Sequence, residues 1–383
     1  MSSYCNGYSG SSSSSDSGIG GNTHEVQESQ ESQESQESQE PPNEYAEYNL
    51  DGGYCRIEFG VVLYKRYTVI KKKGWGHFST AWIVLDNKTG KIHIIKVVKS
   101  TKDCTQSAID EVIILNNVKG LPHIVQIVDS FSIPDSFNKK LYHICIVMED
   151  HGTNLLKLID DTRNGKTMPL AIVKQIGCQL LNALKALETI NLIHADIKPE
   201  NVVFKFDGDG KIIVTLIDLG NAFKPSDGIG GACEIATREY RSFENLVGNP
   251  VDKKSDIWSL VCLLFELATG EYLFEPDDKF FSKDEDHIAL IIELLLKEEE
   301  ILDNKLVCMG SKYLDYFVSD DEGNIELQNI KELTHRSLKN VLIHTYNWEV
   351  ELASKFSALL LPMLELDPKI RISAIDAFLQ WSS

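Results

Sequence analysis

The hydrophobic pattern of this chain changes character once, near residue 150, and this change restricts the architectures that it can adopt. Short segments of apolar residues precede Gly152, separated by Gly and Asn turns as β-strands are. They lie at 67–71, 80–86, 91–99, 124–131 and 141–149, with one helical stretch at 105–117 between them. After Gly152, apolar residues recur at helical spacing, first at 170–187. We predict an α+β fold with a β-rich lobe at 54–149 and a helical lobe at 150–383.

The first 50 residues differ in composition from the rest of the chain. They contain nine acids and no Lys or Arg, whereas the whole 383-residue chain has a net charge of −19. A serine run is followed by a Gln-Glu-Ser repeat at 27–40. So little apolar surface cannot offset the entropy lost on ordering. We therefore predict a disordered acidic tail over 1–53, ahead of the two lobes.

Composition argues against several classes of protein. The eight cysteines include no Cys-x-x-Cys pair, which disfavours a disulfide scaffold and a zinc site. No apolar run approaches the length of about 18 residues that suggests a membrane span, and the N-terminus lacks the features of a secretion signal. The acidic total disfavours direct binding to nucleic acid. We expect a monomer in the cytoplasm, with entry into the nucleus left open.

A glycine-bearing turn joins two of the predicted strands. Its residues are Gly74, Trp75, Gly76, His77, Phe78 and Ser79. Because it connects strand to strand and not strand to helix, it favours a hairpin that covers phosphates over a dinucleotide-binding fold. On its own, the pattern also fits an ordinary hairpin turn.

Lys96 lies within an apolar strand at 92–98, where an unpaired ammonium would be costly to bury. Glu111 follows fifteen residues later in the predicted helix and is the natural partner. Taken alone, Lys96 also fits a solvated strand lysine.

Two further motifs complete the pattern. His-Ala-Asp-Ile-Lys-Pro-Glu-Asn at 194–201 is followed by Asp-Leu-Gly at 218–220. With the hairpin and the lysine, in this order, they resemble the eukaryotic protein kinases. The resemblance implies the bilobal kinase fold with ATP and Mg²⁺ as cofactors. In that scheme Asp196 would accept the proton of the substrate hydroxyl and Lys198 would steady the γ-phosphate, while Mg²⁺ would be held by Asn201 and Asp218.

The same resemblance implies a nucleotide site. Its residues are the hairpin residues Gly74 to Ser79, together with Ala81, Lys96, Glu111 and the backbone of Glu149 and His151. Met148, directly before Glu149, would be the gatekeeper residue. Three other residues match scaffolding positions of the kinase helical lobe, namely Glu244, Asp256 and Arg371.

Within that family, the chain resembles the kinases of serine/arginine-rich (SR) proteins. The likeness covers residue 54 to the end and is carried by stretches at 74–80, 96–100, 218–222, 237–242, 284–294 and 361–366. It implies transfer of the ATP γ-phosphate to serines in Arg-Ser-rich proteins and a role in mRNA splicing regulation.

An acidic block at 271–300 fits such a polycationic substrate, because it contains eleven acids and three lysines. Glu271, Asp286 and Glu293 match the docking acids of the SR-protein kinases. Asp286 and Glu293 are seven residues apart, which on one helix places them on nearly the same face, two turns apart. A merely solvated acidic surface is the alternative.

Two departures from the kinase pattern concern the adenine pocket. Ile94 stands where alanine is usual, and Ala81 stands where valine is usual. We expect the two changes to compensate in volume, and an occluded adenine site is the alternative. Two other functions stay open: a LAMMER-type dual-specificity kinase, and a pseudokinase that docks basic repeat proteins without catalysis.

Overall fold

The computed structural model describes Tyr48 and residues 50–165, 168–227, 234–297, 300–319 and 323–382. The chain divides after Pro42, and all the described residues belong to the second part. Most of the predicted tail at 1–53 lies outside the described residues, so its disorder stays a prediction. No helix in the described segments is long and apolar enough to span a bilayer.

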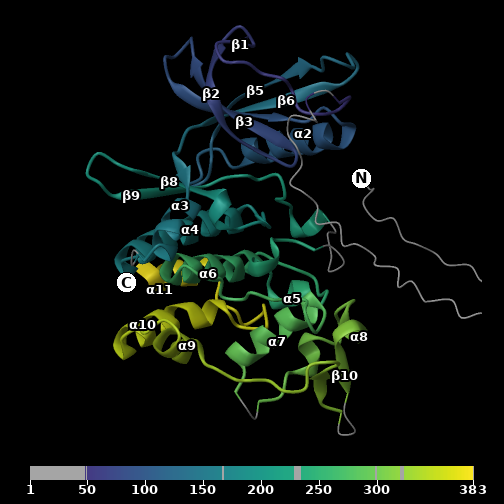
Figure 1. The fold of residues 1–383 in the computed structure, drawn as a ribbon, viewed down its shortest axis with the longest axis vertical. Helices are drawn as coiled ribbons and strands as arrows, with labels where there is room; N and C mark the ends of the chain where they lie inside the picture. Colours follow the sequence, from purple (N-terminus) through teal and green to yellow (C-terminus); the bar gives the residue numbers. More distant parts are fainter. Residues whose placement is uncertain are drawn as a thin grey trace, which may run out of the picture. The chain divides into compact units, whose positions relative to one another are not determined.

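The β-rich lobe is built on a six-stranded antiparallel sheet with the order β1-β2-β3-β4-β6-β5 (Figure 1). Its strands are β1 (Val62–Leu63), β2 (Tyr67–Gly76), β3 (Ser79–Asp86), β4 (Ile92–Val98), β5 (Ile127–Pro134) and β6 (Tyr142–Glu149). The five predicted β segments and the α+β class are confirmed. Strand β1 was not predicted, because two residues are too few to show an alternating pattern.

One face of this sheet covers a small apolar core. Alternate residues of β3, from Thr80 to Asp86, are buried, as expected for a strand with one face turned inward. The core includes Tyr67 from β2, Ile95 from β4 and Phe131 from β5. The alternation that predicts β3 therefore also determines which of its side chains face the core.

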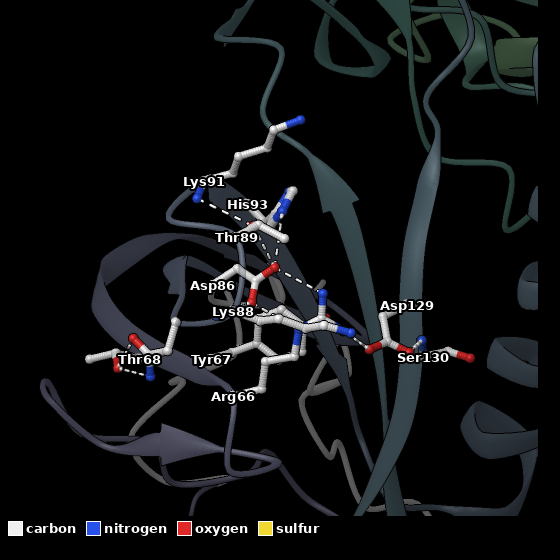
Figure 2. Close-up of polar contacts among 11 residues, drawn as sticks. Arg66, Tyr67, Thr68, Asp86, Lys88, Thr89, Lys91, His93, Asp129 and Ser130 are labelled. Atoms are coloured by element: carbon white, nitrogen blue, oxygen red, sulfur yellow. Dashed lines mark hydrogen bonds and ion pairs between the residues drawn. The ribbon is translucent and has the colours of Figure 1, made fainter.

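The buried acid at the end of β3, Asp86, is paired with an arginine (Figure 2). The Arg66 guanidinium donates hydrogen bonds of 2.8 and 2.9 Å to Asp86 and one of 3.0 Å to Asp129 on β5. The Tyr67 hydroxyl donates to the same Asp129 oxygen at 2.8 Å. The hydrogen bond from Arg66 holds the pKa of Asp86 well below its usual range in spite of burial. These contacts tie β2 and β3 to β5, although β5 is not their neighbour in the sheet.

Helix α2 (Lys102–Asn117) confirms the helix predicted at 105–117 and begins three residues earlier. It begins there because the Thr101 side chain accepts a hydrogen bond from the backbone N–H of Cys104 at 3.3 Å. Its buried residues are Ala108, Glu111 and Leu115, spaced three and four apart on one face. Glu111 therefore points inward with the apolar residues.

The helical lobe is organised around α6 (Lys254–Thr269), in which every residue from Ser255 to Ala268 is buried. The helix ends at Gly270, whose φ of 88° is the left-handed conformation that glycine adopts without strain. Helix α4 (Leu170–Thr189) packs against α6 and against α11 (Ala374–Ser382). A Cβ added to Gly177 of α4 would lie 2.4 Å from the ring of Trp381, so only glycine allows this approach.

Shorter elements complete this lobe. A three-stranded sheet, β7 (Thr153–Asn154), β8 (Val202–Phe206) and β9 (Ile212–Leu216), packs on α4. Within the described residues, the further α-helices of this lobe are α3 (Leu156–Arg163), α5 (Phe243–Leu246), α7 (Lys283–Leu295), α8 (Tyr313–Tyr316), α9 (Leu338–His344) and α10 (Val350–Leu360). After α8, strands β10 (Phe317–Ser319) and β11 (Ile325–Leu327) pair antiparallel; α8 and β10 are labelled in Figure 1.

Candidate active site

Three charged side chains from both lobes meet at one point. The ammonium of Lys96 on β4 lies 2.9 Å from each carboxylate oxygen of Glu111 on α2. It also lies 2.8 Å from Oδ1 of Asp218, which follows β9. The structure therefore brings together the lysine and glutamate that the sequence analysis paired, and it adds an aspartate predicted to hold metal.

Electrostatic coupling keeps Lys96 and Asp218 of this cluster charged. Burial alone would lower the pKa of Lys96, but the charges of Glu111 and Asp218 raise it above its usual value. Burial raises the pKa of Glu111. Burial would also raise the pKa of Asp218, but the charge and the hydrogen bond of Lys96 have the larger effect, so the pKa of Asp218 is lowered. Asp218 is therefore ionised at neutral pH, as a metal-binding carboxylate must be.

A second cluster surrounds Asp196, which is buried in the loop before β8. Asn201 donates through Nδ2 to the Asp196 carboxylate at 2.9 Å and to its backbone oxygen at 2.8 Å. The Lys198 ammonium lies 3.0 Å from the same carboxylate and donates to the Thr237 hydroxyl at 2.8 Å. The Thr237 hydroxyl in turn donates to Asp196 Oδ1 at 3.0 Å. The carboxylate is thus held by three neighbours.

This loop is held in place by Asp256 at the start of α6. The Asp256 carboxylate accepts from the backbone N–H groups of His194 and Ala195 at 2.7 and 2.9 Å. Ala195 has a φ of 66°, and Asp218 has one of 63°, conformations that are unfavourable for residues other than glycine. Ala195 directly precedes Asp196 and Asp218 is itself a candidate metal ligand, so the strained backbone lies at the site. Asp256 holds the strained backbone at Ala195 through its two hydrogen bonds.

A cavity of about 330 Å³ is lined in part by the first cluster, Lys96, Glu111 and Asp218, and its volume is within the range of ligand pockets. Its apolar lining comes from both lobes and consists of Ala81, Ile94, Val125, Met148, Val203 and Ile217. Gly74, Trp75, Gly76, Ser79, Glu149 and His151 also line it, as the sequence analysis proposed. The cavity is present despite the isoleucine at 94, which disfavours an occluded adenine site.

Two predicted nucleotide-binding residues, His77 and Phe78, do not line this cavity. They form the tip of the β2–β3 hairpin, where the Phe78 side chain is 62% exposed. By contrast, Gly74 and Gly76 face open space, because a Cβ added to either would meet no described atom within 4 Å. The hairpin backbone can therefore be approached closely by phosphate oxygens.

Asn201 and Asp218 suit a magnesium ion in their donor chemistry. Asn201 uses only Nδ2 in its bonds to Asp196, which leaves its Oδ1 as an oxygen donor. No group of three or more His, Cys, Asp or Glu side chains among the described residues could hold a metal. A two-residue site of this kind suits Mg²⁺, which is commonly bound by one or two protein groups plus substrate phosphates and water.

The helical lobe is closed by a buried ion pair between α5 and the segment before α11. Arg371 donates to both carboxylate oxygens of Glu244, at 2.8 and 2.7 Å. It also donates to the backbone oxygens of Lys254 and Glu365. This pair therefore fixes α5, which follows the segment containing Thr237, to the segment before α11.

The predicted docking acids lie on and before α7. Asp286 and Glu293 both belong to this helix, whereas Glu271 is exposed in the segment between α6 and α7. Each of the two helix acids already accepts one backbone hydrogen bond, Asp286 from Asp277 at 2.9 Å and Glu293 from Thr334 at 2.7 Å. One carboxylate oxygen of each therefore has no hydrogen bond to another described residue.

The other two acids of the block at 284–286 have internal partners. Asp284 pairs with Arg238 and accepts from the Tyr316 hydroxyl at 2.8 Å. Glu285 is buried and accepts from the backbone and side chain of Asn329 at 2.7 and 2.8 Å. These two acids hold α7 to its surroundings, so fewer charges are available for docking than the acid count suggests.

His287, in the next position of α7, makes the stability of this lobe sensitive to acid. Burial lowers its pKa to about 3, with Arg238 and Arg241 nearby, and neither ring nitrogen has a hydrogen-bond partner among the described residues. The unfolded chain takes up this proton near pH 6.5, but the folded chain does not. The free energy of unfolding should therefore fall as the pH drops below about 6.5.

We expect His287→Leu to flatten this dependence. From pH 7 to pH 5 the native protein should lose about 2 kcal/mol more unfolding free energy than the variant, measured by urea unfolding at each pH. His344→Leu, at an exposed histidine of α9, is the matched control and should keep the native slope. An equal fall of unfolding free energy with pH in His287→Leu and in the native protein would contradict the attribution of this fall to His287.

Several residues of the site were given no role by the sequence analysis. Thr237 bridges Lys198 and Asp196, and Lys73, Asn154 and Glu200 line the cavity. Thr237 stands in the stretch at 237–242 that carries the likeness to the SR-protein kinases, so the signal for it was present. Glu200 lies within the motif at 194–201 and Lys73 directly precedes the glycine hairpin, but neither motif gives these residues a role of their own. Asn154 lies in a segment without a motif, and only the fold brings it to the cleft.

Comparison with known proteins agrees with this geometry. The family model described as "Protein kinase domain" matches residues 67–381. "Serine/threonine-protein kinase SRPK" of Physarum polycephalum is 34% identical, over 85% of this chain and 88% of its own. "Protein kinase dsk1" of Schizosaccharomyces pombe is 29% identical, over 86% and 83%. "SRSF protein kinase 3" of Homo sapiens is 27% identical, over 88% of each chain.

The family model spans most of the chain, and the likeness to the Physarum kinase extends over most of both proteins. The matched range contains Lys96, Asp196 and Asp218, the residues on which the two polar clusters are built. This chain therefore belongs to the protein kinase family, in its SR-protein kinase branch, and is a serine/threonine protein kinase.

Proposed function

We propose that this kinase uses ATP with Mg²⁺ to phosphorylate serines in Arg-Ser-rich proteins, and that it acts in the regulation of mRNA splicing. The observation that carries the proposal is that two polar clusters lie next to each other and that one of them lines the cavity. The backbone N–H of Ile217, directly before Asp218, donates to the backbone oxygen of Asn201 at 2.8 Å and so joins the two. Lys96 with Glu111 and Asp218 forms one cluster, and Asp196 with Asn201 forms the other. An open cavity with a glycine hairpin above it supplies the space for the nucleotide.

The geometry suits direct phosphoryl transfer. A serine hydroxyl beside Asp196 would give its proton to the carboxylate while its oxygen attacks the γ-phosphorus. The bond from that phosphorus to the bridging oxygen breaks, and ADP leaves with the electron pair. Lys198 would place positive charge beside the transferred group, and Lys96 would orient the other phosphates. Mg²⁺, when held by Asn201 and Asp218, would neutralise phosphate charge.

Substrate choice is proposed from the charge of α7 and from the names of the relatives. The human relative is called an SRSF protein kinase, and this chain carries Asp286 and Glu293 on one helix. A guanidinium can bind a carboxylate oxygen that has no other partner. Two such carboxylates on one helix would bind neighbouring arginines of an Arg-Ser repeat.

A direct test compares three peptides of equal length. We expect fast labelling of an Arg-Ser repeat, slower labelling of its Lys-Ser analogue because lysine lacks the planar fork, and little labelling of a Ser-Pro peptide. Efficient Ser-Pro or tyrosine labelling would favour the LAMMER-type alternative. No labelling of any peptide and no ATP turnover would favour the pseudokinase.

Charge reversal on α7 should weaken substrate capture without changing the chemical step. For Asp286→Lys/Glu293→Lys we expect KM for a long Arg-Ser repeat to rise roughly tenfold and kcat to stay similar, since rim charges act on encounter and binding. The effect should shrink at high salt, because the Debye length is about 8 Å at physiological ionic strength.

The matched control carries the same change of charge at exposed acids outside α7. Asp209→Lys/Glu349→Lys should leave KM for the repeat close to the native value. An equal rise in both double variants would show that only net charge matters, and the proposed docking surface would then be rejected.

The protein is further proposed to act as a monomer, in the cytoplasm with entry into the nucleus left open. The support for the compartment is compositional, since the apolar runs are too short to favour a membrane span and the cysteine pattern does not favour a disulfide scaffold. Light scattering and fluorescence of a tagged full-length chain test these two points.

A further inference from the structure

Lys73 connects the glycine hairpin to the chain just after β6. It lies on β2, directly before Gly74. Its Nζ lies 3.0 Å from Asp150 Oδ1 and 2.6 Å from the backbone oxygen of Gly152. The side chains of Lys73 and Asp150 are each 30% exposed. One ammonium thus makes two short bonds across the rim of the cleft, and we call these contacts the Lys73 clasp.

The acceptor side of the clasp is held rigidly. The Asp150 carboxylate also accepts the backbone N–H of Gly152 at 3.1 Å, which closes a tight turn. Gly152 has a φ of 102°, and a Cβ there would lie 2.1 Å from the backbone oxygen of Phe204 on β8. Burial alone would raise the pKa of Asp150. The hydrogen bond from Gly152 and the contact with Lys73 have the larger combined effect, so the pKa of Asp150 lies below its usual value. The turn therefore presents an ionised acceptor in a fixed place.

The donor side is compliant. The pairing of β2 with β3 shifts register between Val69 and Lys71 and again between Lys72 and Gly74. Such irregularities bend a strand and interrupt its ladder. Lys73 sits within the second one, so the ladder restrains this part of the hairpin less than a regular strand would. A bond from Lys73 to the fixed turn supplies the missing restraint.

The clasp also borders the nucleotide cavity. Lys73 belongs to its lining, together with Gly74 and Gly76 of the hairpin and with Glu149 and His151, which flank Asp150. Nucleotide that enters or leaves between the hairpin and the Asp150–Gly152 turn must pass residues that the clasp joins. Movement of the hairpin away from this turn disrupts both bonds of Lys73.

We propose that Lys73 is a positioning residue that fastens the glycine hairpin to the turn at Asp150 and Gly152, and that it slows the release of nucleotide from the cleft. This inference rests on the proposed use of ATP. It assigns to Lys73 a role apart from Lys96, Asn201 and Asp218, which would hold the phosphates and Mg²⁺, because Lys73 joins the hairpin to the Asp150–Gly152 turn.

The test measures release of a fluorescent ADP analogue from the full chain by stopped flow, in the presence of Mg²⁺. We expect release to be about fivefold faster from Lys73→Met and from Asp150→Asn, the size of effect that losing one partly exposed ion pair produces. Lys73→Arg, which keeps the charge, should release at nearly the native rate. High salt should narrow the difference between the native protein and Lys73→Met.

Lys71→Met is the matched control, since Lys71 is an exposed lysine of the same strand, and its release rate should be native. Steady-state kinetics with ATP add a second readout. KM for ATP should rise in Lys73→Met, and kcat should rise with it wherever ADP release limits turnover. Equal thermal unfolding of the native protein and the variants would show that the fold is intact.

The failure of this inference differs from the failure of the proposed function. If the native protein retains the ADP analogue but Lys73→Met and Asp150→Asn release it at the native rate, the clasp has no kinetic role. The clasp is equally rejected if Lys71→Met speeds release as much as Lys73→Met does. If the native protein does not bind the analogue at all, the proposed use of ATP is rejected.

Discussion

Asp196→Ala is expected to lower kcat by roughly 10³-fold, since a positioned general base contributes about 10²–10⁴-fold. ATP affinity should remain nearly native. Asp196 is absent from the cavity lining, whereas Lys96 and Asp218 belong to it. The carboxylate is instead held by Asn201, Lys198 and Thr237 at hydrogen-bond distance, ready to accept a proton. Steady-state rates on an Arg-Ser repeat and titration with a fluorescent ATP analogue measure the two quantities.

Two variants serve as controls for this result. Asp218→Asn should impair nucleotide binding as well as turnover, because Asp218 lines the cavity and pairs with Lys96. Asp209→Asn, at an exposed turn, should change neither. Turnover of Asp196→Ala at the native rate would show that the carboxylate is not the base, and loss of ATP binding by this variant would show that its role is not confined to the chemical step.

Arg371→Met is expected to lower the free energy of unfolding by roughly 3–5 kcal/mol, the cost of leaving one charge of a buried pair without its partner. Arg371 is 1% exposed and donates to both oxygens of Glu244. Its removal also leaves the backbone oxygens of Lys254 and Glu365 without their donor. Urea unfolding followed by tryptophan fluorescence measures the loss.

A double variant separates the cost of an unpaired buried charge from the cost of lost packing. Glu244→Met/Arg371→Met should lose less unfolding free energy than the sum of the two single variants, because the double variant leaves no buried charge unpaired. Lys369→Met, at an exposed lysine two residues before Arg371, should be nearly neutral. A loss in Arg371→Met no larger than that of Lys369→Met would show that the pair does not stabilise the lobe.

Local patterns predicted much of the architecture. Strand alternation at 80–86 and helical spacing at 170–187 reflect which side of each element is buried, so they determine type and approximate extent. The observed start of a helix differs from the predicted start where a side chain caps the helix. Thr101 caps α2, which begins three residues before the predicted helix. Capping depends on one side chain and carries no periodic signal.

The catalytic loop was also readable from the chain, because its residues lie within eight positions of one another and their order is distinctive. The partner of Lys96 could be named from the cost of burying an amine. The acids at 284–286, by contrast, look equivalent in the sequence. Of the three, only Asp286 keeps an oxygen that accepts no hydrogen bond from the described residues, because Arg238, Tyr316 and Asn329 occupy the carboxylates of the other two.

The amino-acid sequence by itself determined the kinase family and the order of β-rich and helical parts, and it named the candidate catalytic residues, since these depend on local periodicity and on short motifs. The tertiary structure decided which charges are paired internally, which residue completes the Asp196 cluster and how Lys73 reaches the turn after β6. Such contacts join residues far apart in the chain, and their existence depends on distance and burial, which no local pattern encodes.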